Sequence, residues 1–251
     1  MRLENSFVPV EGVGTTTERQ LWQSGVTHWD HFAPNHLGGV RGERVAAFID
    51  DARDKLAAGE AGFFATALPS GELWRAYENF RSGTCFFDIE TTGLDADTSV
   101  VTTVSCHRDG ETRTYVRGED LTADALRREF ADADLLATFN GKRFDVPFLE
   151  QRLGLSVDTP HLDLMYPCRR LDLTGGLKAI EREIGLERDR PDISGRDAVR
   201  LWHEHERGAD GALETLVSYN REDAVNLRTL ADVVTDRLHD EVFVAPETGA
   251  D

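Results

Sequence analysis

The chain has 251 residues, of which 40% are hydrophobic, and it carries a formal net charge of −18. This length and composition allow one substantial α/β domain of about 150 to 170 residues and a smaller unit, but exclude a second full-size domain. Because proteins bind phosphate groups mainly through Lys and Arg, a net charge of this sign ordinarily argues against a nucleic-acid partner.

The N-terminal residues predict a small helical unit. Residues 7–32 contain glycine turns around polar, helix-like runs, which predicts two short helices. The segment VEGVGTTTERQLWQSGV, residues 10–26, resembles a helix-hairpin-helix motif, in which a Gly-x-Gly turn presents backbone N–H groups to a phosphate. The alternative is a small packing domain whose aromatic residues form its own core or dock on the rest of the chain. These residues are Trp22, Trp29 and Phe32.

Two polar stretches follow, and their apolar residues recur at helical spacing. They are residues 42–56 and 72–81. We expect both to form helices that link the small unit to the rest of the chain.

An alternation of strands and helices begins at Thr84. The buried-type strand TCFFDIE is followed by a turn and by the alternating strand VVTTVSCH, and Asp109-Gly110 predicts a hairpin into TRTYVRG. An amphipathic helix at 122–131, the short strand LLATF and the helix VPFLEQRLG come next. The order β, β, β, α, β, α is typical of the ribonuclease H-like fold, so we predict an α/β fold with a central mixed sheet flanked by helices.

After Pro167 the sequence predicts mostly helices. They cover GLKAIEREIGL, RDAVRLWHEHERG and a long run from Ala212 to about Leu238. The last residues, APETGAD, are predicted to form a tail.

The origin of the net charge weakens the argument against nucleic acid. Only three residues are lysine, and the acidic residues are spread over every segment. This pattern resembles proteins of salt-in halophiles, and molar salt shortens the screening length to about 3 Å. The net charge therefore does not decide the function.

Cysteine usage and hydropathy favour a cytoplasmic protein with no membrane partner. No stretch reaches the roughly 18 to 20 consecutive apolar residues of a membrane-spanning helix. The N-terminus has neither a basic start nor a long apolar run. Cys85, Cys106 and Cys168 are widely spaced and form no CxxC pair, which predicts buried free thiols.

Two acidic residues interrupt the first apolar strand. Asp88 and Glu90 are two residues apart in FFDIE, so a strand places their side chains on one face. Burial of two carboxylates together costs free energy unless a cation neutralises them. Carboxylate oxygens suit Mg²⁺ or Mn²⁺, and two such ions about 3.5 to 4 Å apart can stabilise both oxygens of a phosphoryl displacement. The alternative is a strand end at which both residues reach solvent or a helix N-terminus.

Four further residues have a functional and a structural interpretation. Asp145 stands before Val-Pro, a common helix start, so an N-cap is its structural alternative. Tyr219 and Asp223 are four residues apart in a predicted helix, so their side chains lie on one face and can contact the same ligand. The alternative for this pair is an ordinary, partly exposed helix face. Asp163, at a predicted strand end, has an outer-shell position around the other acids as its functional interpretation, but we expect a structural hydrogen bond to a neighbouring loop.

Taken together, these motifs resemble those of the DEDD exonucleases. FFDIETTGL, FNGKRFDVPFL and the helix pattern Tyr-x-x-x-Asp occur in the order and spacing of the subclass that carries tyrosine. LDLMYPCRR, GLKAIEREIGL and SYNREDAVNL are also similar to segments of the YprB-like predicted exonucleases. The resemblance covers residues 84–238. It implies a 3′-5′ exonuclease that cuts single-stranded nucleic acid, DNA in preference to RNA, with two Mg²⁺ or Mn²⁺ ions.

The resemblance also implies roles for individual residues. Asp88 would bridge both ions, and Glu90 and Asp223 would complete the site of the ion that activates water. Asp145 would help to hold the second ion, and Tyr219 would orient the attacking hydroxide.

Substrate contacts are expected after the first two motifs. Residues that follow Glu90 would line the pocket of the terminal nucleotide, with Leu94 wedged against a base. Asn140 would support the substrate or the strand end, and the basic pair behind it would contact phosphate or be ordinary solvated charges. The expected substrate-binding residues are Thr91, Thr92, Leu94, Asn140, Lys142 and Arg143.

The predicted organisation has four parts. They are a helix-hairpin-helix-like unit (1–40), a helical linker (41–82), a ribonuclease H-like exonuclease domain (83–240) and a tail (241–251). A non-catalytic nucleic-acid-binding or scaffolding module of the same fold is the alternative function, and a nuclease acting on RNA ends is a third interpretation. The sequence does not indicate which protein partners the chain has.

Overall fold

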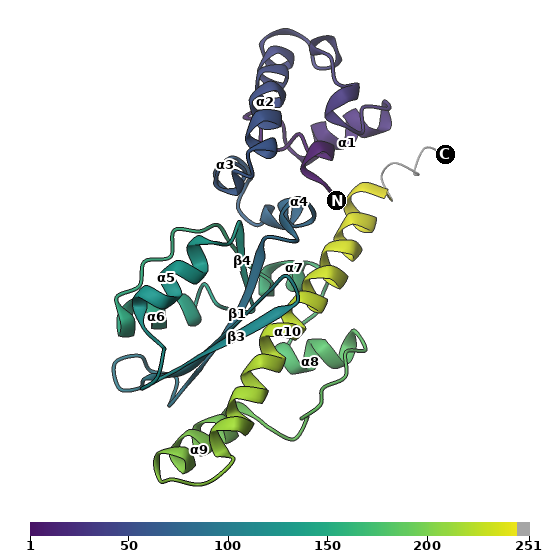
Figure 1. Cartoon of the computed structure of the whole chain (residues 1–251). Coiled ribbons are helices and arrows are strands. Elements are labelled where there is room, and N and C mark those ends of the chain that lie inside the picture. Colours follow the sequence, from purple (N-terminus) through teal and green to yellow (C-terminus); the bar gives the residue numbers. More distant parts are fainter. Residues whose placement is uncertain (245–251) are drawn as a thin grey trace. The chain divides into compact units, whose positions relative to one another are not determined.

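The computed structural model describes residues 1–244, and the predicted tail residues APETGAD lie outside them. The chain divides into two compact units, Met1–Arg81 with Val233–Asp251 and Ser82–Asp232. The first unit is helical and the second contains a sheet with helices (Figure 1). Within the described residues, none of the helices has the length and apolar character that crossing a bilayer needs.

Short helices build the first unit. They are α1 (Thr15–Gln23), α2 (Gly39–Ala57), α3 (Ala61–Ala67), α4 (Tyr77–Phe80) and the single-turn segments η1 (Leu3–Asn5), η2 (Trp29–His31), η3 (Pro34–His36), η4 (Leu73–Ala76) and η5 (Asp240–Val244). The predicted pair of helices between residues 7 and 32 forms only in part, because α1 is followed by the single turn η2. Residues 8–12 before the Gly-Val-Gly turn form turns and no helix, since Pro9 disfavours a helical conformation for Val8.

Aromatic side chains form the interior of the first unit. Trp22 and Trp29 are each only 2% exposed, and their indole N–H groups donate to the backbone carbonyls of Asn5 and Ser6, both at 2.9 Å. The ring of Phe32 packs against that of another phenylalanine, with 5.7 Å between centroids. The indoles thus contribute to the unit's own core, as the packing alternative predicts.

The second unit has five strands. They are β1 (Thr84–Thr91), β2 (Val101–Arg108), β3 (Glu111–Val116), β4 (Leu135–Thr138) and β5 (His161–Asp163). The sheet order is β3-β2-β1-β4-β5, with antiparallel pairing on the β3 side of β1 and parallel pairing on the β5 side. Asp109 and Gly110 both adopt positive φ, 51° and 81°, which suits the tight turn between β2 and β3.

Six helices accompany this sheet. They are α5 (Ala123–Ala131), α6 (Asp145–Leu153), α7 (Met165–Arg170), α8 (Leu177–Glu183), α9 (Gly195–Glu206) and α10 (Ala212–His239), the last turns of which belong to the first unit. The predicted α/β fold with a mixed sheet and the order β, β, β, α, β, α is therefore confirmed.

The two faces of β1 differ in chemistry. Cys85, Phe87 and Ile89 belong to one buried cluster with residues of α5 and α6, so Asp88 and Glu90 alternate onto the opposite face. Figure 1 shows α5 and α6 on one side of the sheet and α7 and α10 on the other. The carboxylates of β1 therefore face the side on which α10 lies.

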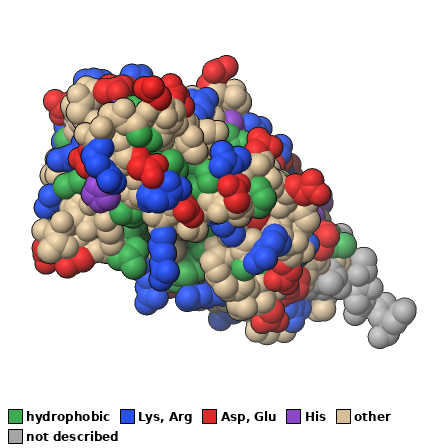
Figure 2. All heavy atoms as spheres, turned by 90° about the horizontal axis from the view of Figure 1, so that it is seen from below, with side chains coloured by type: hydrophobic (Ala, Val, Ile, Leu, Met, Phe, Trp, Pro, Cys, Tyr) green, Lys and Arg blue, Asp and Glu red, His purple; other side chains and the backbone are tan. Residues whose placement is uncertain are grey.

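Two composition-based predictions can be compared with the structure. The three cysteines are free and buried, as predicted. Acidic and basic side chains are interspersed on the face of the molecule in Figure 2, in keeping with the dispersed charge of the sequence. The halophilic interpretation stays a prediction.

Candidate active site

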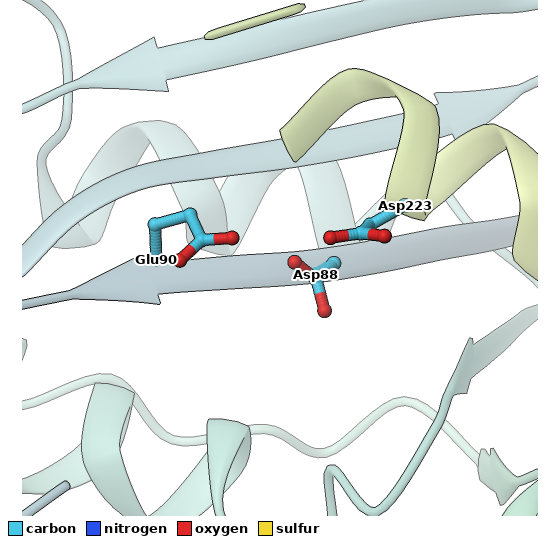
Figure 3. Close-up of side chains that lie close together, drawn as sticks. All are labelled: Asp88, Glu90 and Asp223. Atoms are coloured by element: carbon cyan, nitrogen blue, oxygen red, sulfur yellow. The ribbon is translucent and has the colours of Figure 1, made fainter. Parts of the chain in front are cut away.

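Three carboxylates converge from a strand and a distant helix. One oxygen from each of Asp88, Glu90 and Asp223 lies within 4.8 Å of the others. Figure 3 shows the two strand residues and the α10 residue at one place beside β1. Asp88 and Glu90 are half-buried, and Asp223 is only 5% exposed. The pair on β1 therefore faces another carboxylate, while the first residues of α8 and α9 line the same hollow.

A fourth acidic residue approaches the same strand. Asp145 is 4% exposed and is the first residue of α6, whose N-cap is Phe144, so the N-cap interpretation of Asp145 is wrong. The backbone N–H of Ile89 donates to the carboxyl group of Asp145. The charge of Asp145 raises the pKa of both Asp88 and Glu90. Asp145 therefore belongs to the same electrostatic cluster.

The ionised forms of these carboxyl groups are unfavourable in the metal-free protein. Burial is the main cause that raises the pKa of Asp88 and Glu90 well above their ordinary values, and the charges of Asp223 and Asp145 add to it. Burial also raises the pKa of Asp223, against the opposing effect of Arg188, and raises the pKa of Asp145 to about 7. Such a cluster gains from a cation that neutralises it.

Two side chains that the sequence did not single out orient the acids. Asn220 is fully buried, and its Nδ2 donates to the carbonyl (3.2 Å) and to Oδ2 (2.8 Å) of Asp88. Arg188 donates to Asp223 and, at 2.6 Å, to the fully buried Glu181. Asn220 could have been found from its position three residues before Asp223 on the same helix. Arg188 lies between helices, where no periodicity marks it.

Tyr219 lies on the buried face of α10. It is 5% exposed, so a partly exposed helix face is the wrong interpretation of this pair. Lys178 Nζ lies 4.7 Å from the centroid of its ring. A cavity of about 400 Å³ is lined by Tyr219, Asp88, Glu90, Asp223, Lys178 and neighbouring residues of β1, α8 and α9. The structure thus brings the predicted phenol and three predicted carboxylates to one hollow.

The two threonines after Glu90 have hydroxyl partners within the chain. Thr91 Oγ1 donates to the carbonyl of Gly93 at 2.7 Å, and Thr92 Oγ1 accepts from the backbone N–H of Val100 at 3.0 Å. The register between β1 and β2 shifts between Glu90 and Thr91, and such bulges redirect the side chains beside them. The threonines therefore shape the end of β1, and their contact with a substrate stays a prediction.

The other predicted substrate contacts are near the surface. The side chain of Leu94 is 87% exposed, and Lys142 and Arg143 are also exposed. Asn140 has a φ of 65°, and its backbone N–H donates at 2.7 Å to Asp163. Asp163 also accepts from the Lys142 N–H at 3.1 Å, so its predicted structural hydrogen bond to a loop is confirmed. Substrate binding by these surface residues stays a prediction.

The comparison with protein families gives one match. The family model described as the RNase_H superfamily matches residues 85–235. This span runs from β1 into α10 and contains every carboxylate of the cluster. No curated protein matches the sequence significantly.

Several solved structures are similar in fold to this chain. One is described as the apo form of a nuclease, with 21% identity, 67% of this chain and 83% of that chain covered, and a TM-score of 0.47. Brucella melitensis NrnC bound to pGG has 20% identity, covers 68% of this chain and 81% of its own, and gives a TM-score of 0.48. The family B DNA polymerase of Pyrobaculum calidifontis has 18% identity and a TM-score of 0.48, and the match covers 65% of this chain and 25% of that chain.

Proposed function

This chain belongs to the RNase H superfamily, and from that membership and the acidic cluster we propose that it is a metal-dependent 3′-5′ exonuclease. We assign it to the DEDD type, in the tyrosine subclass and the YprB-like group. The proposed substrate is single-stranded nucleic acid, DNA in preference to RNA. The observation that carries the proposal is the convergence of Asp88, Glu90, Asp223 and Tyr219 on one cavity.

The donor set fits divalent cations. It consists of carboxylate oxygens alone, the ligands that Mg²⁺ and Mn²⁺ prefer. The carboxylates come from β1, α6 and α10, and burial and mutual repulsion raise the pKa values of the pair on β1. A bound cation offsets both the cost of burying these charges and their mutual repulsion. We therefore propose that Asp88, Glu90, Asp145 and Asp223 hold two ions.

Each residue of the site has a proposed task. The bound cations would lower the pKa of the attacking water and stabilise the charge that develops on the phosphoryl oxygens. Asn220 would keep the Asp88 carboxylate in one orientation through its hydrogen bond. Arg188 would hold one oxygen of Asp223. Tyr219 would orient the attacking water from the wall of the cavity.

Residues outside the cavity are proposed to hold the strand. The exposed Leu94 side chain is available to pack against a base, and Lys142 and Arg143 are available to phosphate. Thr91, Thr92 and Asn140 are proposed to line the path of the terminal nucleotide. These contacts supply positioning and affinity for the strand, while the carboxylates supply the chemistry.

The test is digestion of single-stranded DNA and RNA, labelled at the 3′ or the 5′ end, in high salt with Mn²⁺. Wild type should shorten strands stepwise from the 3′ end, and Asp88→Ala and Asp223→Asn should abolish this digestion. Asp54→Ala removes an exposed carboxylate of α2 and should leave digestion unchanged. Retention of digestion by either site variant, with an unchanged fold, would overturn the proposal, as would inactive wild type.

A further inference from the structure

A second cavity adjoins the acidic one. Its volume is about 650 Å³, and it is formed by α8 and the segment that follows this helix. Lys178 lines both cavities, and Arg188, which lines the second, donates a hydrogen bond to Asp223 of the first. We call it the α8 cavity, with the lining residues Lys178, Arg182, Gly185, Leu186, Glu187, Arg188 and Pro191.

Two basic groups of the α8 cavity stand outside ion pairs, although the charge of Lys178 also acts on Glu90 and Asp223. Within residues 1–244, neither Lys178 nor Arg182 forms an ion pair. Lys178 instead donates to the carbonyl of Ile193, and Arg182 Nε donates to the carbonyl of Lys178 at 3.3 Å. The charge of Arg188 is balanced by Glu181 and Asp223, and Glu187 is the one acid in the lining. In a chain with a net charge of −18, two such cations in one lining can receive an anion.

The remainder of the lining is apolar. Leu186 is half-buried, Pro191 is exposed and Gly185 has no side chain. Volumes of about 300 to 1,000 Å³ are typical of small-ligand sites, in which apolar walls surround a few polar groups. A nucleotide joins an anionic phosphate to a flat ring with apolar faces, so it matches both parts of this lining.

We propose that the α8 cavity binds the nucleotide that precedes the terminal nucleotide of a single strand. Its phosphate lies against Lys178 and Arg182, and its base or sugar lies against Leu186 and Pro191. Lys178 lines both cavities, and this shared residue is the reason to choose a strand over a free nucleotide. A strand whose scissile phosphate lies at the carboxylates must leave that site, and the α8 cavity opens beside it. This proposal rests on the proposed exonuclease function.

The test compares two substrates that differ in the preceding nucleotide. One is a single-stranded oligonucleotide, and the other is the p-nitrophenyl ester of thymidine 5′-monophosphate, in which p-nitrophenol replaces that nucleotide. Arg182→Ala should lower kcat/KM on the strand about tenfold, as expected for loss of one charge-assisted contact, and should affect the ester far less. The slope of log kcat/KM against log salt concentration should also become shallower by about 0.7 for the strand.

The matched control is Arg128→Ala, which removes an exposed arginine from α5 on the other face of the sheet. This control should leave kcat/KM unchanged on both substrates. An equal loss on both substrates, no loss on either, or an unchanged salt slope in Arg182→Ala would overturn the α8 proposal. Thymidine 5′-monophosphate could also inhibit wild type. If Arg182→Ala relieved this inhibition and left kcat/KM on the strand unchanged, the cavity would be a product site and the α8 proposal would be overturned. Wild type that hydrolyses neither substrate would instead refute the exonuclease function itself.

Discussion

Each unit of the chain buries charge, but the two do so in opposite ways. In the first unit, Glu18 and Arg75 are both fully buried and pair at 2.9 Å. The second Glu18 oxygen accepts from the Ser6 hydroxyl (3.0 Å) and from the backbone N–H of Phe7 (2.7 Å), and Arg75 also binds Glu72 at 2.6 Å. Each charge in this network has an opposite charge and hydrogen bonds beside it.

The second unit gathers several carboxyl groups around few cations. The carboxyl groups are those of Asp88, Glu90, Asp145, Glu181 and Asp223. Arg188 pairs with Glu181 and Asp223, but no ion pair reaches Asp88 or Glu90 within residues 1–244, and the pKa of both is raised well above the ordinary value, first by burial. A network in which opposite charges pair stabilises one structure. A cluster with unpaired carboxylates is instead a candidate site for an external cation. Removal of a charge should therefore have opposite effects in the two units.

The largest expected effect is in the balanced network. Glu18→Gln keeps the shape of the side chain but leaves the buried Arg75 guanidinium without one of its two carboxylates. Removal of one partner from a buried ion pair costs about 3 to 5 kcal/mol. We expect the lower end because Glu72 remains. Denaturant unfolding measures this loss. Glu60→Gln, which breaks an exposed pair with Lys55, should cost far less because water screens this pair, and equal losses in the two variants would contradict the comparison.

The same carboxyl-to-amide change should stabilise the second unit. Asp88→Asn removes a carboxyl group, and both burial and the charge of Asp223 oppose the ionisation of that group. The amide oxygen of the variant can still accept from Asn220. At pH 8 without metal we expect a gain of about 2 kcal/mol, or roughly 4 to 8 °C in Tm for a chain of this size. Mn²⁺ should raise the Tm of wild type and hardly that of the variant. A variant that melts below wild type in the metal-free state would remove the contrast between the units.

The sequence predicted the acids of the cluster better than the groups that balance them. Period-two alternation in β1 and four-residue spacing in α10 place Asp88, Glu90, Tyr219 and Asp223 on the faces that the structure buries together. These are local rules, and they do not determine the place of β4 beside β1, which depends on tertiary structure. The partner groups come from tertiary structure: Arg188 reaches the cluster from a segment between helices, where neither periodicity nor a motif marks it.

The first unit shows the same limit. Glu18 stood in the sequence as one acid of a polar, helix-like run, and nothing local indicated that Arg75, 57 residues later, pairs with it. The helix-hairpin-helix resemblance depended on the Gly-Val-Gly turn, but the Pro9 segment before that turn forms no helix. Short motifs predict a turn, whereas the element on either side depends on its own residues.

The smallest expected effect, taken over one pH unit, is the pH dependence that Asp145 contributes. Burial raises its pKa in the folded protein to about 7, above the ordinary 3.8, so the folded state binds this proton more tightly than the unfolded state. The stabilisation is complete below about 3.8 and is lost as the pH rises through 7. In the metal-free protein this group should lower the free energy of unfolding by at most about 1.4 kcal/mol between pH 5 and pH 6.

Asp145→Asn cannot titrate, so the difference between wild type and this variant reports Asp145 together with its effect on Asp88 and Glu90, and removes the contribution of the histidines. Thermal unfolding of both proteins at a series of pH values measures this difference. The Tm of wild type should fall relative to that of the variant as the pH rises from 5 to 7. Saturating Mn²⁺ should remove or reverse that trend, because a cation binds the ionised carboxylate. Parallel curves without metal would mean that Asp145 is ionised at little cost, and that the charge imbalance in the second unit is confined to the carboxylates of β1 and α10.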